Sequence, residues 1–292
     1  MKLFCMLLST LVALATCAHA YGATLYGATA SGSPGRLYIL NSANGSQLQD
    51  VGPLNDVTGL NYPITGLAFH PTTGVLYGST GNNPAATAGR FVAINPATAE
   101  VTAIGPFNAG PVNDSGTPAT MTDLAFDSAG NLFGVASIGG PQLYSINIAT
   151  GQATVIGNSG IASTTGGGLA INSSGVFYGT PTASRFGTYD TTTGVFTNIA
   201  APNRPGNAGA LAALDFDPSG VLYAMHSAPG SPPPTNLVTI DPATAMVTLL
   251  GSSVIALDAI AFRPDIIPEP SVIVLLLGAA LASIVARLRA HS

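Results

Sequence analysis

The sequence predicts an all-β protein, a β-propeller built from five four-stranded blades. Three observations lead to this prediction. A repeat returns every 45 to 57 residues, each copy holds four short apolar runs separated by turn residues, and two incomplete copies at the ends of the repeat region complete one another. Repeats of this length, each forming a small antiparallel sheet, are typical of propellers, in which blades stack around a central axis.

The first half of the repeat predicts a β-hairpin. It reads ITGLAFHPTTGVLYGST from Ile64, MTDLAFDSAGNLFGVAS from Met121, GGGLAINSSGVFYGTPT from Gly166 and LAALDFDPSGVLYAMHS from Leu211. Its turns combine an Asx side chain that bonds the backbone, Pro that presets φ and Gly that takes the left-handed position. One large apolar position recurs, with spacings of 57, 45, 45 and 46 residues, at Phe69, Phe126, Ile171, Phe216 and Phe262.

The second half predicts another hairpin, which completes a four-stranded antiparallel sheet. It reads GRFVAINPATAEVTAIG from Gly89, PQLYSINIATGQATVIG from Pro141, SRFGTYDTTTGVFTNIA from Ser184 and TNLVTIDPATAMVTLLG from Thr235. Its turns begin at Asn41, Asn95, Asn147, Asp190 and Asp241.

The two ends of the repeat region predict closure of the ring. The region opens with ATLYGAT and GRLYILNSANGSQLQDVG, which lack a first strand, and it closes with an orphan first strand, LDAIAF, at 257–262. Joined in one sheet, they form a fifth blade and cover the last sheet edge. Two alternatives are six blades, with a degenerate blade in the Gly105 to Ala119 insertion, and a solenoid, which would not explain the complementary half-units.

The first strands predict how blades pack. One face carries large side chains (Leu67, Leu124, Leu169, Leu214 and Ile260) and the other carries small ones (Ala68, Ala125, Ala170 and Ala261). A large face against a small face lets neighbouring blades nest. The turns resemble the L-Y-x-I-D-P-x-T-G pattern of NHL and YVTN-like propeller repeats. The resemblance covers most of residues 21–265 and implies a fold but no activity.

The N-terminus predicts export. Lys2 precedes an apolar run, Leu3 to Ala15, and Ala18-His19-Ala20 fits a small-x-small cleavage pattern. We therefore expect a signal peptide over 1–20, cut by signal peptidase between Ala20 and Tyr21. The alternatives are an uncleaved anchor and a lipid-modified Cys17, for which the preceding Thr16 is a poor fit.

The C-terminus predicts a membrane helix over 271–286. Pro268-Glu269-Pro270 is followed by sixteen uncharged residues, SVIVLLLGAALASIVA, and then by Arg287 and Arg289. As a helix this segment would be about 24 Å long, short of a hydrocarbon core of about 30 Å. Local thinning and snorkelling arginines would close the gap. Arginines after the span favour a cytoplasmic C-terminus.

Residues 266–292 resemble the PEP-CTERM sorting signal of exopolysaccharide-producing Gram-negative bacteria. The match comprises Pro268-Glu269-Pro270, the apolar span and a terminal basic cluster, which is thin here because it holds only Arg287 and Arg289. The resemblance implies that an exosortase acts near Pro268-Glu269-Pro270. The product would pass from the inner membrane to the cell surface or extracellular matrix. The alternative is an anchor that is never processed.

Charge and cysteine content exclude several kinds of site. Residues 21–265 hold five arginines and no lysine against twelve acids, so nucleic-acid binding and adsorption on anionic lipid are not expected. Both cysteines, Cys5 and Cys17, lie in the signal segment, and no metal-ligand spacing occurs. We expect no cofactor and no catalytic residue.

Few side chains are left as candidates for chemistry. Asp127, Asp190, Asp217 and Asp241 are explained as turn caps, His70 as a turn residue, Glu100 as exposed and His226 as structural. Asp123, Asp215 and Asp258 lie on predicted innermost strands, where they would form an acidic rim of the central channel. Such a rim would bind a cation or polar ligand, or it would hydrogen-bond to water and backbone, which is the favoured interpretation.

The leading hypothesis is a non-enzymatic surface or matrix protein that binds polysaccharide or another surface protein. The longest loops, Gly81 to Gly89, Phe107 to Thr120 and Pro229 to Thr235, are candidates for contact. A spacer without a ligand is not separated from this hypothesis. The alternative is an extracellular hydrolase or lactonase with a metal at the channel aspartates, an argument that depends on fold analogy.

Overall fold

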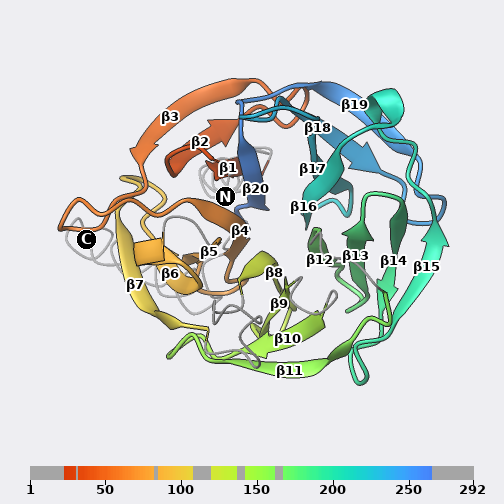
Figure 1. Ribbon diagram of the computed structural model, residues 1–292, viewed down its shortest axis with the longest axis horizontal. Coiled ribbons are helices and arrows are strands. Elements are labelled where there is room, and N and C mark those ends of the chain that lie inside the picture. The colour runs from red at the N-terminus through yellow and green to blue at the C-terminus, as the bar shows by residue number, and fades with distance from the viewer. Residues whose placement is uncertain are drawn as a thin grey trace, which may run out of the picture.

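The protein is a five-bladed β-propeller in the computed structural model (Figure 1), which describes residues 23–30, 32–81, 85–107, 120–136, 142–161 and 167–264. Within them, five separate four-stranded antiparallel sheets surround a central axis. The six-bladed and solenoid alternatives are therefore wrong. The predicted signal peptide, 1–20, and the predicted segment 266–292 with its span 271–286 lie outside the described residues. No helix among the described residues is long and apolar enough to cross a membrane.

Each blade has its first-type strand nearest the axis and its fourth-type strand at the rim (Figure 1). Blade 1 has the order β20 (Leu257–Phe262), β1 (Leu25–Thr29), β2 (Arg36–Leu40) and β3 (Gln47–Pro53). Blade 2 comprises β4 (Ile64–Phe69), β5 (Leu76–Thr80), β6 (Arg90–Ile94) and β7 (Val101–Pro106), and blade 3 comprises β8 (Met121–Phe126), β9 (Leu132–Ala136), β10 (Gln142–Ile146) and β11 (Ala153–Asn158). Blade 4 comprises β12 (Leu169–Ile171), β13 (Phe177–Thr182), β14 (Arg185–Tyr189) and β15 (Phe196–Ala200), and blade 5 comprises β16 (Ala210–Phe216), β17 (Leu222–Ser227), β18 (Thr235–Ile240) and β19 (Val247–Ser252). Two short 3₁₀ turns, η1 (Ala85–Thr87) and η2 (Pro205–Asn207), lie in connections.

Blade 1 is composite, as the half-repeats predict. β20 pairs antiparallel with β1, with Leu25 opposite Phe262 and Gly27 opposite Ile260. Beyond the strand, the Arg263 N–H donates to the Thr24 carbonyl at 2.9 Å. The innermost strand of this blade is therefore the last strand of the chain, and its pairing with the first strand closes the ring.

The core is divided into five clusters, and each one lies between two adjacent blades. The cluster between blades 1 and 2, for example, packs Leu67, Leu76 and Ile94 of blade 2 against Ala28 and Ala261 of blade 1. The other four clusters repeat this arrangement. The predicted packing of a large face on a small face is thus confirmed, and each blade is stabilised by its neighbours.

An aromatic pair recurs at four of the five blade interfaces. The recurring Phe of a first strand meets the Tyr of the second strand in the preceding blade. The ring-centroid distances are 5.3 Å for Tyr26–Phe69, 5.7 Å for Tyr77–Phe126, 5.7 Å for Tyr178–Phe216 and 4.8 Å for Tyr223–Phe262. At the fifth interface Phe133 and Ile171 share a cluster. Such pairs fix the orientation of each inner-strand side chain at the end of its strand.

Glycines on the outermost strands allow blades to approach each other closely. A Cβ atom at Gly157 of β11 would lie 1.8 Å from the Thr193 carbonyl oxygen in the next blade, and one at Gly105 of β7 would lie 2.3 Å from that of Thr150. Because these contacts are with backbone, a side chain would force the blades apart.

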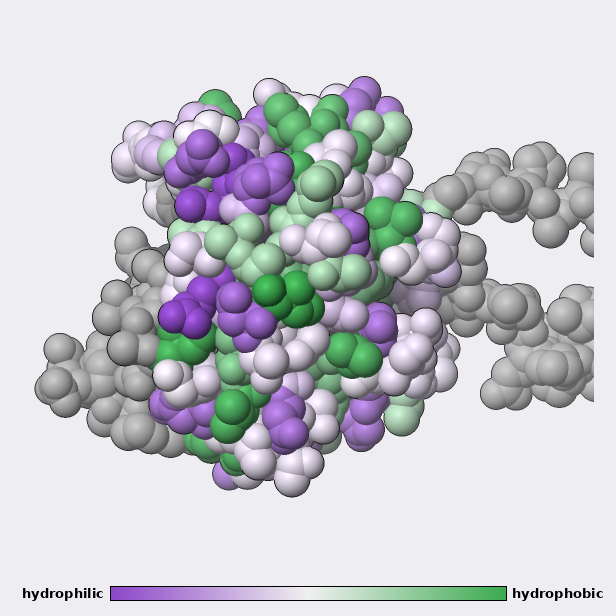
Figure 2. Space-filling model, turned by 90° about the vertical axis from the view of Figure 1, so that its right-hand side faces the viewer, coloured by the Kyte–Doolittle hydropathy of each residue, from purple (hydrophilic) through white to green (hydrophobic). Residues whose placement is uncertain are grey.

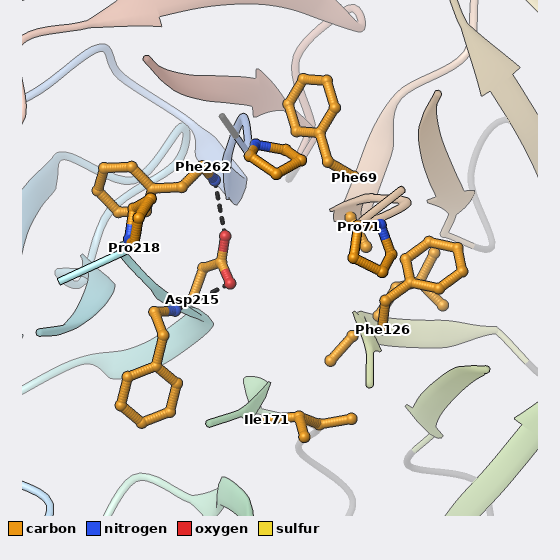
Figure 3. A pocket seen from close by; sticks show the side chains of 12 residues that line it. Phe69, Pro71, Phe126, Ile171, Asp215, Pro218 and Phe262 are labelled. Carbon is orange, nitrogen blue, oxygen red and sulfur yellow. Dashed lines mark hydrogen bonds between the residues drawn. The ribbon is translucent and has the colours of Figure 1, made fainter. Parts of the chain in front are cut away.

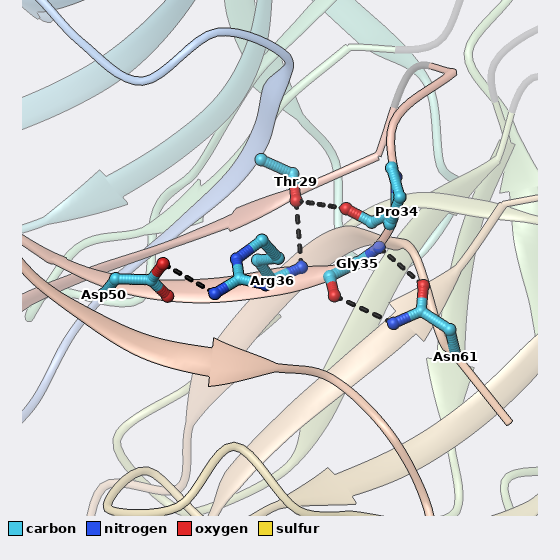
Figure 4. A network of polar contacts seen from close by, with 6 residues as sticks. All are labelled: Thr29, Pro34, Gly35, Arg36, Asp50 and Asn61. Carbon is cyan, nitrogen blue, oxygen red and sulfur yellow. Dashed lines mark hydrogen bonds and ion pairs between the residues drawn. The ribbon is translucent and has the colours of Figure 1, made fainter. Parts of the chain in front are cut away.

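The connection between β1 and β2 is held by side chains that bond the backbone (Figure 4). The Thr29 hydroxyl donates to the Pro34 carbonyl at 2.7 Å and accepts from the Arg36 N–H at 2.9 Å. The Asn61 side chain accepts from the Gly35 N–H at 2.7 Å and donates to the Gly35 carbonyl at 3.0 Å. These bonds fix blade 1 against the segment that leads to blade 2.

Candidate binding site at the mouth of the central channel

A cavity of about 330 Å³ opens at one end of the channel, where the innermost strands end (Figure 3). Its wall contains the recurring position of all five blades: Phe69, Phe126, Ile171, Phe216 and Phe262. Pro71, Pro218 and Pro264, each two residues further on, complete the rim, and Ala68, Leu124 and Ala125 lie deeper. Asp215 is the one charged residue among the described residues of this lining. We call this cavity the channel mouth.

The repeat itself builds the channel mouth. Each first strand runs toward this end and places its last large side chain there, and each interface packs that side chain against the neighbouring blade. Phe69 and Phe262 are only 6% exposed, whereas Phe126, Ile171 and Phe216 are partly exposed to the cavity. The wall is therefore apolar and held in place by the core.

Asp215 bridges two blades at the edge of the cavity. One carboxylate oxygen accepts from the Phe216 N–H at 2.9 Å, and the other accepts from the Phe262 N–H of β20 at 2.6 Å. The latter bond is drawn in Figure 3. Burial in the apolar mouth raises the pKa of Asp215 to about 7, although both N–H donors act in the opposite direction. The carboxyl group therefore changes its charge near neutral pH.

Asp123 joins three blades deeper in the channel. It lies on β8 and is fully buried. Its Oδ2 accepts from the Leu169 N–H of β12 at 2.9 Å and from the Leu214 N–H of β16 at 3.0 Å, and its Oδ1 accepts from the Leu124 N–H at 2.9 Å. Innermost strands have a free edge toward the axis, and one carboxyl group here satisfies N–H groups on two of them.

The ionisation of Asp123 is disfavoured. Burial raises its pKa well above the usual range, and the nearby charge of Asp215 acts in the same direction. The three N–H donors lower the pKa without cancelling the effect of burial.

The structure brings two of the three predicted rim residues together. Asp123 and Asp215 interact electrostatically, and both bond to backbone, as the favoured interpretation expected. Asp258 lies near the start of β20 and is partly exposed. Among the residues described, no group of three or more His, Cys, Asp or Glu side chains is arranged to hold a metal ion. A metal bound through Asp123 Oδ2 would compete with the two backbone N–H groups that already bond to this oxygen.

The other candidates occupy structural positions, as predicted. The His226 side chain is buried, with Nε2 2.9 Å from the Ala208 carbonyl oxygen. His70 Nδ1 lies 3.3 Å from the Thr72 and Thr73 N–H groups of its turn. The four turn aspartates accept backbone N–H bonds at their own turns, and Glu100 is exposed.

The sequence reasoning missed the cavity. It treated the recurring Phe and Ile position as packing, and it treated the prolines two residues later as turn formers. The signal was present, because equivalent positions at the ends of five inner strands must surround the axis in a closed ring.

A family model matches residues 25–215 and is described as "Repeat of unknown function (DUF6923)". The chain belongs to this family. No curated protein matches the chain. The repeats of the family thus correspond to blades of the propeller over the matched part, and the family description names no activity.

Solved structures show similarity at low identity. A protein of unknown function from Bacteroides thetaiotaomicron VPI-5482 has a TM-score of 0.46 and 14% identity, with 76% of this chain and 56% of that chain covered. The chain thus spans little more than half of that protein's length. A protein of unknown function from Bacteroides caccae has a TM-score of 0.45 and 12% identity, with 82% and 99% covered. A protein described as a "putative gluconolactonase" has a TM-score of 0.43 and 13% identity, with 81% and 79% covered.

The bonds made by Asp123 predict a large loss of stability on truncation. Asp123→Ala leaves the Leu169 and Leu214 N–H groups buried without this acceptor, at a cost of about 1–3 kcal/mol each. Asp123→Asn keeps one acceptor oxygen and should cost clearly less. Asp127→Ala, in an exposed turn, is the control and should cost at most about 1 kcal/mol. Urea unfolding measures all three, and equal losses for the Ala and Asn variants would contradict the bridging role.

The pKa of Asp215 predicts a pH dependence of stability. The folded protein binds this proton more tightly than the unfolded chain, whose Asp pKa is about 4, so the stabilisation is present at low pH. It is lost as pH rises toward 7, by roughly 2–4 kcal/mol. Asp215→Asn should reduce the change in unfolding free energy between pH 4.5 and 7.5. The change that remains should come from Asp123, whose pKa is also raised by burial.

Urea midpoints at pH 4.5, 6.0 and 7.5 measure this slope. Asp190→Asn is the control, because hydrogen bonds in its exposed turn lower that pKa and place its effect below the window. An unchanged slope in Asp215→Asn would contradict the assignment.

Proposed function

We propose that the protein is a non-enzymatic binding or structural module of the cell surface or extracellular matrix of a Gram-negative bacterium. In this proposal the segment 1–20 directs export, and an exosortase sorts the chain at Pro268-Glu269-Pro270. The inner membrane holds it through 271–286 before processing. Partners of the exported module are exopolysaccharide or surface proteins of a biofilm, and nucleic acid is not among them.

The observation that carries the proposal is the position of the two ends of the propeller. Thr24 and Arg263 are hydrogen-bonded to each other beside the channel mouth, and Pro264 lines it. The predicted export and sorting segments therefore join the propeller at the same end of the channel. A tether that follows Pro264 would hold the mouth end toward the membrane.

The predicted contact loops begin at the other end of the inner strands. Gly81 follows β5 and Thr120 precedes β8, and both lie at the ends opposite Leu76 and Phe126, which are at the mouth end. The connection Pro229 to Thr235 follows β17 at the same far end. A tethered propeller would thus present these loops away from the membrane, which suits a surface binding module.

A scaffold role also agrees with how the buried carboxyl groups are used. Asp123 and Asp215 together accept five backbone N–H bonds, and three of them, from Leu169, Leu214 and Phe262, connect inner strands of different blades. Groups engaged in this way hold the ring together.

Mass spectrometry of the protein from fractions of its native host tests the proposal. We expect the mature chain to begin at Tyr21 and to end near Pro268-Glu269-Pro270 in the surface or matrix fraction. Replacing these three residues by Ala should retain the uncut chain in the membrane fraction, whereas Ser271→Ala, the neighbouring control, should be processed normally. An intact tail ending at Ser292 in the wild-type protein would contradict sorting.

A further inference from the structure

The channel mouth has the size and shape of a small-molecule site. Its volume of about 330 Å³ is at the lower end of the range for ligand pockets. The bonds of Asp123 to β12 and β16 join the inner strands beneath it. Figure 3 shows the labelled side chains around an open centre, with Asp215 at one side. A ligand would therefore enter from the mouth end and lie against the five-blade wall.

The side-chain composition of the lining differs from that of the outer surface. Of the twelve described residues that line it, eleven have apolar side chains, and Asp215 is the exception. At the outer rim near β15 and β19, by contrast, apolar and polar side chains are mixed (Figure 2). Ile199 and Leu249 are exposed there as isolated apolar side chains, which is common on protein surfaces. A concave wall of apolar side chains with a few fixed polar groups is the usual composition of a specific site for a small ligand.

The charge that Asp215 contributes to the cavity is negative, and no cation is present among the described lining residues. Among the described residues, the lining contains no Arg, Lys or His, and the one ion pair, Arg36–Asp50, is on blade 1 between β2 and β3. The charge of Asp217 in the adjacent turn adds to the negative potential at Asp215. The carboxylate is also fixed in position, since each oxygen accepts one backbone N–H and keeps a lone pair for a ligand.

We infer that the channel mouth binds a small organic ammonium ion with an aromatic or branched aliphatic body. The ammonium group would donate to Asp215, and the body would contact the Phe and Pro wall. Phe126 and Phe216 are partly exposed and available for cation–π contact.

This inference depends on the proposed binding role of the propeller, but not on export or sorting. Its test uses binding alone, whereas the sorting proposal is tested by the chain ends. The two can therefore fail separately.

Isothermal titration of the purified protein with phenethylamine at pH 8, where Asp215 is ionised, tests the inference. 2-Phenylethanol and phenylacetate are the neutral and anionic probes of similar shape. We expect the amine to bind at least tenfold more tightly than the alcohol, and the anion to show no binding. No binding of the amine, or equal affinity for amine and alcohol, would overturn the inference.

Two variants locate the site. Asp215→Asn should reduce amine affinity to that of the alcohol. Pro218→Lys places a cation on the exposed rim. It should lower the affinity for the amine at least tenfold and change the affinity for the alcohol by no more than twofold. Pro242→Lys is the matched control, since Pro242 follows Asp241 in the other turn of the same blade and does not line the mouth.

Thermal unfolding of each variant shows whether it is folded. Amine binding that is unchanged in folded Pro218→Lys, or that falls equally in Pro242→Lys, would overturn the placement at the mouth.

Discussion

The antiparallel pairing of β1 with β20 joins residues from the two ends of the propeller into one sheet, and the other features of the ring depend on it. Leu25 pairs with Phe262, and the Arg263 N–H continues the pairing to Thr24. Without this pairing, blade 1 would lack its inner strand, and the small face of Ala259 and Ala261 would be missing from the interface with blade 2. Blade 5 would likewise lose Leu257 and Ile260 from its interface with blade 1. Closure therefore completes two of the five core clusters.

A closed ring creates both the cavity and the need for the buried carboxyl groups. The innermost strands leave unpaired N–H groups toward the axis, and Asp123 and Asp215 accept from four of the five inner strands, those of blades 1, 3, 4 and 5. Burial raises the pKa of both groups, although the N–H donors lower it, so the electrostatics of the ring are sensitive to pH. At the mouth end, five equivalent side chains form one wall because five strands end at the same level.

Much of the fold could be predicted because the repeat carries it. The alignment of Phe69 with Phe126, Ile171, Phe216 and Phe262 predicted five inner strands, and the complementary half-units predicted the composite blade. The large and small faces and the Asx turns were also readable, since they depend on residues close in sequence. The site was harder to predict from the sequence. Asp123 bonds to Leu169 and Leu214, which are 46 and 91 residues away, and no local pattern indicates that reach.

Ring closure is tested most directly by native-state hydrogen exchange of the intact protein, read by mass spectrometry of peptides. If β20 is a full member of blade 1, the amides of Leu257–Phe262 should exchange as slowly as those of Ile64–Phe69 and Met121–Phe126, and all three should open together with global unfolding. Exchange in 257–262 that is faster by orders of magnitude, with β4 and β8 still protected, would contradict the closed ring as the basis of this structure.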